Sequence, residues 1–189
     1  MSTLKERISA AARELFLRDG PEGVSMRKVA ERVGVSAPAI YHHYASKDDL
    51  LKEIIDEGLR ILEDYLRPAL ERSTPFERLS MLVDRFLDFA LEQPKYFDFA
   101  FAVPSRDEER VPEGIEQWST FRLAVEQVAA CMEEGLLRRD DPFQVVLMLW
   151  AEAHGLVMLY RVGRFGMDPE HFRLVYRAAI QRLLRGLGP

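Results

Sequence analysis

Apolar residues recur every three or four positions along almost the whole of this 189-residue chain. That spacing gathers them on one face of an α-helix, whereas a half-buried strand alternates apolar and polar residues. No segment combines such alternation with the valine, isoleucine and threonine content that is typical of strands. The sequence therefore predicts an all-α protein that is long enough to bury a core without disulfides.

Polar caps, prolines and glycines predict where the helices begin and end. Thr3 and Glu6 have the spacing of a capping box, and Gly20 follows the first helix that they start. Ser25 and Ser36 are expected to cap two short helices that are separated by Gly34. Further helix starts are predicted at Ser46, Thr74, Asp141 and Asp168.

Prolines also bound an aromatic segment in the middle of the chain. Pro94 and Pro104 enclose several tyrosine and phenylalanine residues, and we expect the two prolines to limit regular helix between them. A polar loop is predicted over residues 105–113, and a long helix over residues 112–137. The last helix, from Pro169 to about Leu187, has an apolar stripe along one side.

Composition narrows the possible function. Cys131 is the single cysteine, which excludes an internal disulfide framework and a cysteine-based zinc site. The N-terminus has no secretory-signal pattern, and the longest apolar stretch, residues 145–151, is far shorter than a membrane span. We therefore expect a cytoplasmic protein with no membrane partner. Residues 1–52 carry nine basic and seven acidic side chains, against 17 basic and 24 acidic side chains in the remainder, which hints that the N-terminal part meets a polyanion.

The stretch from Ser25 to Lys47 has the organisation of a helix-turn-helix. Two short helices are separated by residues 33–36, and the second helix of such a motif docks in the major groove of DNA. Ala37 and Ala39 are small enough for the start of the second helix to approach base edges closely. Helix N-termini offer free N–H groups to phosphates, and Lys47 is placed to reach one as well.

Residues 8–54 closely resemble the DNA-binding domain of the tetracycline-repressor-like (TetR) family. The matching runs are Ala11-Ala12-Arg13-Glu14-Leu15-Phe16, Gly20, Val24-Ser25-Met26-Arg27-Lys28-Val29-Ala30, Gly34-Val35-Ser36, Ile40-Tyr41-His42-His43-Tyr44 and Ser46-Lys47-Asp48-Asp49-Leu50-Leu51. The resemblance implies a DNA-binding domain over residues 1–46 and a ligand-binding and dimerisation domain over residues 47–189. It implies packing roles for Val29, Ala30, Val33, Ile40 and Tyr44. It implies DNA contacts for Ser25, Arg27, Ser36, Ala37, Pro38, Ala39, Tyr41, His42, His43 and Lys47.

The run Trp150-Ala151-Glu152-Ala153-His154-Gly155 resembles the WHG class of ligand-binding domain in the same family. That resemblance implies a homodimer formed by the last two helices, and we expect Ile180 and Leu183 in its interface. It also implies a pocket for a small, mostly apolar effector, with His154 or Glu152 as its polar anchor. The residues expected to line that pocket are Phe97, Phe101, Trp118, Phe121, Trp150, His154 and Met158.

Several alternatives remain open at this point. The aromatic residues are core residues by default, and the favoured interpretation of His154 is a hydrogen-bonded core histidine, with a pocket anchor as the alternative. The preferred interpretation is a ligand-released repressor that binds a pseudo-palindromic operator as a homodimer. One alternative is a helix-turn-helix regulator without an effector, controlled by a protein partner. Another is an enzyme with a vestigial DNA-binding part, although no nucleophile, phosphate-loop or dinucleotide motif appears. We expect no cofactor, and no cluster of residues has the spacing of metal ligands.

Overall fold

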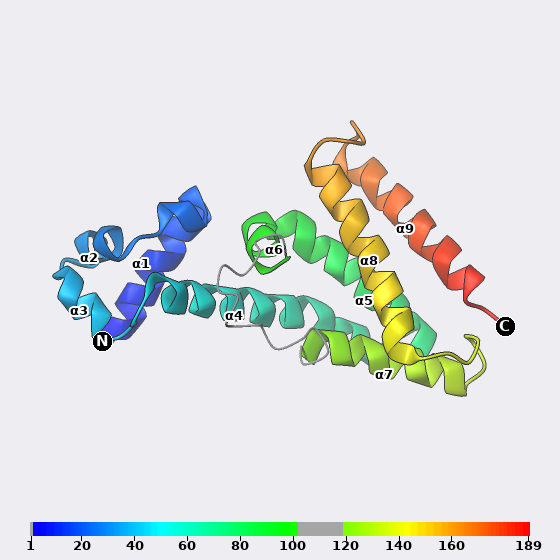
Figure 1. Cartoon of the computed structure of the whole chain (residues 1–189). Helices are drawn as coiled ribbons and strands as arrows, with labels where there is room; N and C mark the ends of the chain where they lie inside the picture. Colours follow the sequence, from blue (N-terminus) through cyan, green and yellow to red (C-terminus); the bar gives the residue numbers. More distant parts are fainter. Residues whose placement is uncertain (1, 102–118) are drawn as a thin grey trace. The chain divides into compact units, whose positions relative to one another are not determined.

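The computed structural model describes residues 2–101 and 119–189, in which every regular element is helical (Figure 1). The predicted all-α fold class is therefore confirmed. The α-helices are α1 (Leu4–Asp19), α2 (Met26–Val33), α3 (Ala37–Tyr41), α4 (Lys47–Leu66), α5 (Pro75–Glu92), α6 (Pro94–Phe101), α7 (Ser119–Glu133), α8 (Pro142–Arg161) and α9 (Pro169–Gly186). Short 3₁₀ turns cover Pro21–Gly23 and Arg67–Glu71.

All seven helix starts that the caps predict are confirmed. The Thr3 hydroxyl accepts a hydrogen bond from the Glu6 amide at 3.2 Å, and the Glu6 carboxylate accepts one from the Thr3 amide at 2.7 Å. Thr74 and Glu77 repeat this reciprocal arrangement at the start of α5. Ser36 does precede α3, but its side chain makes no capping hydrogen bond. The position of the helix start was predicted correctly, but the expected capping hydrogen bond to the Ser36 side chain is not formed.

The aromatic segment differs from the expectation. Residues 94–101 form a regular helix, α6, so the idea that Pro94 limits helix there was wrong. Pro94 occupies the first helical position, where its missing N–H costs nothing, and it therefore starts the helix instead of breaking it. The predicted loop over residues 105–113 lies outside the described residues, as does the first part of the helix predicted over residues 112–137.

The described helices pack as two compact units. The first contains α1, α2, α3, α4 as far as Ile61, and α6; the second contains the rest of α4 from Leu62, together with α5, α7, α8 and α9. The predicted boundary between residues 46 and 47 follows the helix-turn-helix motif, whereas these units follow packing. α4 therefore contributes to both units.

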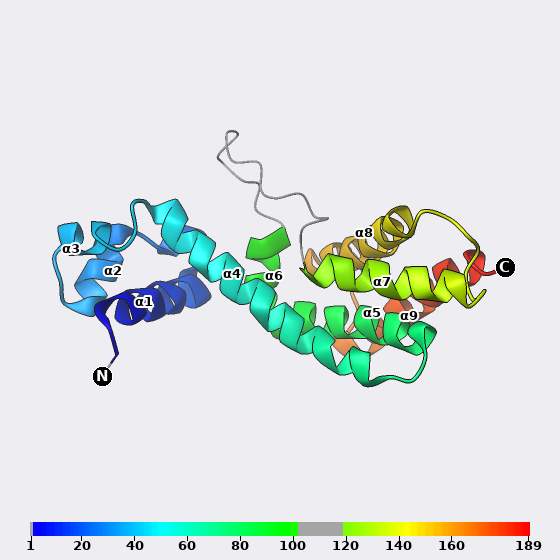
Figure 2. The same ribbon diagram turned by 90° about the horizontal axis from the view of Figure 1, so that it is seen from below.

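In the first unit, α6 packs on α1 and α4, and it lies against α4 in both views (Figures 1 and 2). Tyr96 and Phe97 are buried, and the rings of Tyr96 and Phe16 are 5.9 Å apart. On α4, a Cβ atom added to Gly58 would lie 3.0 Å from a ring carbon of Tyr96, so a side chain at this position would require Tyr96 to shift. Arg13 of α1 pairs with Glu57 of α4 at 2.5 Å beside the same tyrosine. Elements far apart in the sequence are thus joined around α6.

In the second unit, α5 packs against α7, α8 and α9. The predicted apolar stripe of α9 is buried inside the protomer, at Phe172, Tyr176, Ile180 and Leu184. The Tyr176 hydroxyl donates to the Val83 carbonyl of α5 at 3.1 Å. Ile180 is only 4% exposed, so it belongs to the core of the protomer and is not available for the interface in which we expected it.

α8 is apolar on more sides than the protomer covers. An 18-residue window within it has a mean hydropathy of 1.4, so by length and composition alone the helix could cross a membrane, which the short apolar run in the sequence did not indicate. Only 28% of that window is buried. One such helix is weak evidence for a membrane span, because a helix that packs against protein passes the same test.

Candidate nucleic-acid interface

The turn between α2 and α3 depends on one glycine and one arginine. Gly34 has φ of 78°, a left-handed conformation that glycine adopts at little cost. Its amide and that of Val35 both donate to the Ala30 carbonyl, at 2.9 and 3.0 Å. Arg7 of α1 donates to the Val33 carbonyl at 2.6 Å, which satisfies an acceptor at the end of α2 that has no partner within the helix. The direction in which α3 leaves α2 is fixed by these contacts.

α3 presents polar side chains outward and is anchored by apolar ones. Tyr41 is 54% exposed, and His42 and His43 are exposed beside it. Ser36 and Pro38 are exposed at the start of the helix, and Ala37 and Ala39 are half-buried. The residues predicted to pack behind the motif are all buried, namely Val29, Ala30, Val33, Ile40 and Tyr44. The arrangement leaves one face of α3 free to meet a groove.

Tyr44 links the end of the motif to α4. Its hydroxyl donates to the Glu53 carboxylate at 2.7 Å, and Lys5 of α1 lies 5.7 Å from the centre of its ring. Burial and this hydrogen bond both raise the pKa of Tyr44 above its usual range, so the phenol stays neutral and keeps donating. The predicted packing role of Tyr44 is confirmed by its burial.

Three residues predicted to contact phosphates lie at helix starts. Ser25 precedes α2 and accepts from the Lys28 amide at 3.2 Å, which leaves its hydroxyl proton available. The Arg27 side chain is 87% exposed and pairs with Glu31 at 2.9 Å, and that hydrogen bond raises the pKa of Arg27. Lys47 is half-buried at the first position of α4. Arg27 would therefore have to share its charge with Glu31 to bind a phosphate.

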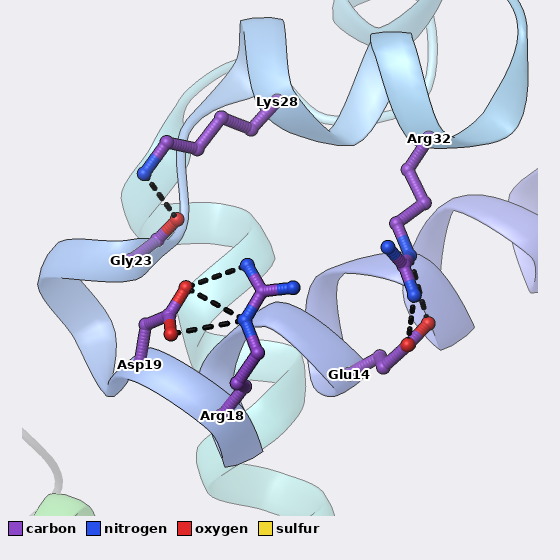
Figure 3. A network of polar contacts seen from close by, with 6 residues as sticks. All are labelled: Glu14, Arg18, Asp19, Gly23, Lys28 and Arg32. Atoms are coloured by element: carbon purple, nitrogen blue, oxygen red, sulfur yellow. Dashed lines mark hydrogen bonds and ion pairs between the residues drawn. The ribbon is translucent and has the colours of Figure 1, made fainter.

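Other cations of the first unit bind protein groups (Figure 3). Arg32 of α2 pairs with Glu14 of α1 through two hydrogen bonds, and Lys28 donates to the Gly23 carbonyl at 3.2 Å. Arg18 binds the neighbouring Asp19 with three hydrogen bonds, which lower the pKa of the Asp19 carboxyl. The Arg32 pair joins α2 to α1, and Lys28 ties α2 to the turn that precedes it.

The residues predicted to line an effector pocket are divided between the two units. Phe97 is buried and Phe101 is half-buried in the first unit, with their rings 5.2 Å apart. The second unit holds Phe121, Trp150, His154 and Met158. Trp118 lies outside the described residues. Within the second unit, the ring of Trp150 lies 5.1 Å from that of His154.

His154 and Glu152 differ in their surroundings. Burial lowers the pKa of His154, which is half-buried and therefore favoured as a neutral ring. Glu152 is exposed on α8 and does not face the interior of the protomer, so it is a poor candidate for a pocket anchor. Among the described residues, no group of three histidine, cysteine, aspartate or glutamate side chains could hold a metal ion.

Three residues with specific roles were not singled out from the sequence. Arg7 closes the end of α2, and Gly58 makes room for Tyr96, but both contacts join distant parts of the chain and leave no local signal. Gln127 is buried on α7. Its signal was available, because it falls on the apolar stripe with Cys131 one turn later.

Comparison with known proteins agrees with this geometry. The pattern described as "Bacterial regulatory proteins, tetR family" matches residues 8–54, and the pattern described as "Tetracyclin repressor-like, C-terminal domain" matches residues 79–183, more than half of the chain. The HTH-type transcriptional activator FasR of Mycolicibacterium smegmatis is 35% identical over 80 residues, which are 42% of this chain and 36% of FasR. The chain spans half or less of the length of each of the first curated relatives that it matches.

Solved structures share the fold over the whole chain. A protein of unknown function from Rhodococcus sp. RHA1 is 25% identical with a TM-score of 0.83, and the match covers 100% of this chain and 97% of that one. A bacterial regulatory protein of the tetR family from Rhodococcus RHA1 is 21% identical with a TM-score of 0.71, covering 100% and 98% of the two chains. The chain therefore belongs to the TetR family, and it is a helix-turn-helix transcriptional regulator and not an enzyme.

Proposed function

We propose that this regulator is a ligand-released repressor that acts in the cytoplasm and binds a pseudo-palindromic operator as a homodimer. Two copies of α3 enter successive major-groove half-sites, with Tyr41, His42 and His43 at base edges and Ser25, Arg27 and Lys47 at phosphates. Ser36, Ala37, Pro38 and Ala39 form the closely approaching start of α3. A small, mostly apolar molecule bound in the second unit stabilises a conformation whose half-site spacing no longer fits the operator.

The observation that carries the release mechanism is the packing of α6. This helix follows α5 of the second unit after a single residue, yet it packs with α1 and α4 in the unit that holds the helix-turn-helix. Tyr96 is buried, its ring lies beside that of Phe16, and it packs closely against Gly58. A shift of α6 would therefore move α4 or α1, because a closely packed interior is hardly compressible and transmits the displacement to its neighbours.

Exposed apolar side chains on the last two helices support the homodimer. Met148 and Leu159 of α8 are 48% and 46% exposed, and Leu174 of α9 is 66% exposed. Met148, Gly155, Leu159 and Val162 are spaced by three, four or seven positions and form one stripe, as a helix–helix contact requires. A partner protomer would cover this stripe and account for the small buried share of α8. The residues around Trp150 and His154 support assignment of the second unit to the WHG class, and Phe121, Trp150, His154 and Met158 are the proposed effector-binding residues.

The experiment is selection of bound sites from random DNA by the purified protein, followed by release with a panel of small apolar compounds. We expect an inverted repeat as the selected site and loss of DNA binding with at least one compound. Gly58→Ala is the mechanistic variant: the added methyl group forces Tyr96 to move, so operator affinity should fall without any compound. Gly186→Ala is the control, because its added Cβ atom would meet nothing within 4 Å.

Two other outcomes would favour different mechanisms. A selected site without symmetry would argue against the homodimer. DNA binding that no compound changes, together with recovery of one specific protein partner, would favour the effector-independent regulator. The name of the FasR relative describes an activator, so a reporter with the selected site placed upstream or downstream of the promoter start decides the sign of regulation.

A further inference from the structure

Gln127 of α7 is the single side chain in the polar or charged class that is buried among residues 2–101 and 119–189. It is 7% exposed, and its carbonyl oxygen Oε1 has no hydrogen-bond partner within the described part of the chain. Buried polar side-chain atoms in native proteins nearly always have a partner, because burial without one forfeits hydration. An unsatisfied amide oxygen in this position therefore requires an explanation.

The surroundings of Gln127 on α7 are apolar. Ala124 lies one turn before it and Cys131 one turn after it on the same face of the helix, and Val128 adjoins that face. Cys131 and Val128 are fully buried, and burial raises the pKa of the Cys131 thiol to about 11. The buried side chains of α5, the helix that packs along α7, are all apolar. Leucine or methionine at position 127 would fill this environment without a polar penalty.

We propose that Gln127 is the polar anchor of the effector site and that the effector binds it through an uncharged primary amide or hydroxyl group. The inference rests on the proposed ligand-released function and adds a specific residue and a ligand class to it. Stability lost to the unsatisfied Oε1 atom in the free protein is recovered when the effector supplies a donor to it.

The chemistry of the side chain defines the ligand class. A glutamine amide offers one acceptor oxygen and two N–H donors, and it carries no charge. A primary amide or a hydroxyl can donate to Oε1 and accept from the N–H groups, whereas a carboxylate cannot donate to Oε1 at all. A charged group would also be buried without a counter-charge, since the described residues bury no ionised side chain. The rest of the molecule must be apolar to match Ala124, Val128 and Cys131.

The test compares the wild-type protein with Gln127→Met, which keeps the length of the side chain and removes its polar atoms. Gln144→Met is the control, because Gln144 is exposed on α8. The probes are naphthalene and decane skeletons, each as the primary amide, the carboxylate and the parent hydrocarbon. Binding is measured by calorimetry, stability by the melting temperature of the free protein, and function by release of the selected operator.

We expect Gln127→Met to raise the melting temperature of the free protein by about 2–4 °C, because an unsatisfied carbonyl oxygen is removed. The wild-type protein should prefer an amide to the matching carboxylate and hydrocarbon, and Gln127→Met should weaken amide binding by about tenfold while leaving the hydrocarbon unaffected. Gln144→Met should leave both properties unchanged.

A lowered melting temperature of the Gln127→Met protein would overturn the proposal, since the amide would then be satisfied in the free protein. The absence of any amide preference in the wild-type protein, or its persistence in the variant, would overturn it as well. Compounds that release the operator equally well from both proteins would refute the role of Gln127 and leave the ligand-released function intact. If amides bind better than the other probes through Gln127 but never release the operator, the ligand-released function is refuted and the role of Gln127 as polar anchor is supported.

Discussion

The two units of this regulator are stabilised in different ways. The helix-turn-helix unit contains helices of only 8 and 5 residues, α2 and α3, which are too short to be stable alone. Buried apolar residues such as Val29 and Ile40 anchor them, and polar contacts such as Arg7 to the Val33 carbonyl and Arg32 to Glu14 add to this. In the second unit, α8 and α9 are 20 and 18 residues long and pack through apolar stripes.

This difference shows where each unit can meet a partner. In the first unit, Arg18, Lys28 and Arg32 bind protein groups, so the phosphate contacts that we propose use Ser25, Arg27 and Lys47 at helix starts. In the second unit, apolar surface on α8 and α9 exceeds what one protomer buries. The first unit therefore offers a polar surface to a polyanion, and the second offers an apolar surface to another helix.

The largest expected effect tests the apolar surface. Leu159→Glu should raise the dimer dissociation constant and weaken operator binding by about 100-fold or more, because it would bury an unpaired charge between protomers. Leu136→Glu is the matched control, since Leu136 is similarly exposed, at 41%, but lies in the turn after α7. Sedimentation gives the oligomeric state, and fluorescence anisotropy gives the DNA affinity. A folded Leu159→Glu protein that still dimerises would exclude this stripe from the interface.

The next effect tests the polar construction of the first unit. Gly34→Ala should lower the free energy of unfolding by about 1–2 kcal/mol, because its φ of 78° is unfavourable for any residue with a Cβ atom. Gly186→Ala, at the end of α9, should change it by less than about 1 kcal/mol, in the stabilising direction. Urea denaturation measures both. Equal effects of the two substitutions would mean that the turn tolerates alanine and that α3 is not fixed in this way.

A smaller effect tests the distribution of charge. Lys47→Ala should weaken binding to every DNA sequence by about 3- to 10-fold and reduce the salt slope by about 1, because one phosphate contact is lost. Lys95→Ala, on α6 of the same unit, should leave the slope unchanged. Anisotropy titrations at several salt concentrations provide the measurement. If the Lys47 variant loses affinity for particular bases only, at an unchanged salt slope, the residue does not bind a phosphate.

Local features of the fold were predictable from the sequence, and distant ones were not. The capping box of Thr3 and Glu6 and the turn at Gly34 each depend on residues a few positions apart, so the pattern contains the whole interaction. The hydrogen bond from Arg7 to Val33 joins residues 26 positions apart. Burial of Ile180 inside the protomer was equally hidden, since an apolar stripe does not show whether the core or a partner covers it.

The candidate site also contains features that local sequence predicts and features that depend on distant contacts. The exposed face of α3 was predictable, because Ile40 and Tyr44 identify its buried side by helical spacing. The effector residues were chosen for aromatic content, which does not specify which unit they join, and Phe97 and Trp150 belong to different units. Gln127 lies on an apolar stripe of α7, and the sequence pattern alone does not show that the oxygen of its amide is buried without a partner.

The smallest expected effect is the pH dependence of stability, which involves a different titrating residue in each unit. Burial lowers the pKa of His154 below its ordinary 6.5, so the unfolded chain takes up this proton first. The free energy of unfolding should therefore be unaffected by His154 above about pH 6.5. It should decrease as the pH falls below that value, because protonation of His154 then favours the unfolded chain. His154→Gln should remove this decrease in the free energy of unfolding, which urea denaturation measures between pH 7.5 and pH 5.

Glu53 should produce the corresponding loss in the first unit at lower pH. Burial raises the pKa of Glu53, but hydrogen bonds, including the one from Tyr44, and the positive charge of Lys5 outweigh it and hold the pKa below its ordinary 4.5. The carboxylate therefore stabilises the first unit above about pH 4.5, and this stabilisation is lost as the pH falls further. Glu53→Gln should flatten the stability curve only below about pH 4.5, whereas the effect of His154→Gln should begin at about pH 6.5. An effect of both variants that begins at the same pH would contradict the assignment of these two losses of stability to His154 and Glu53.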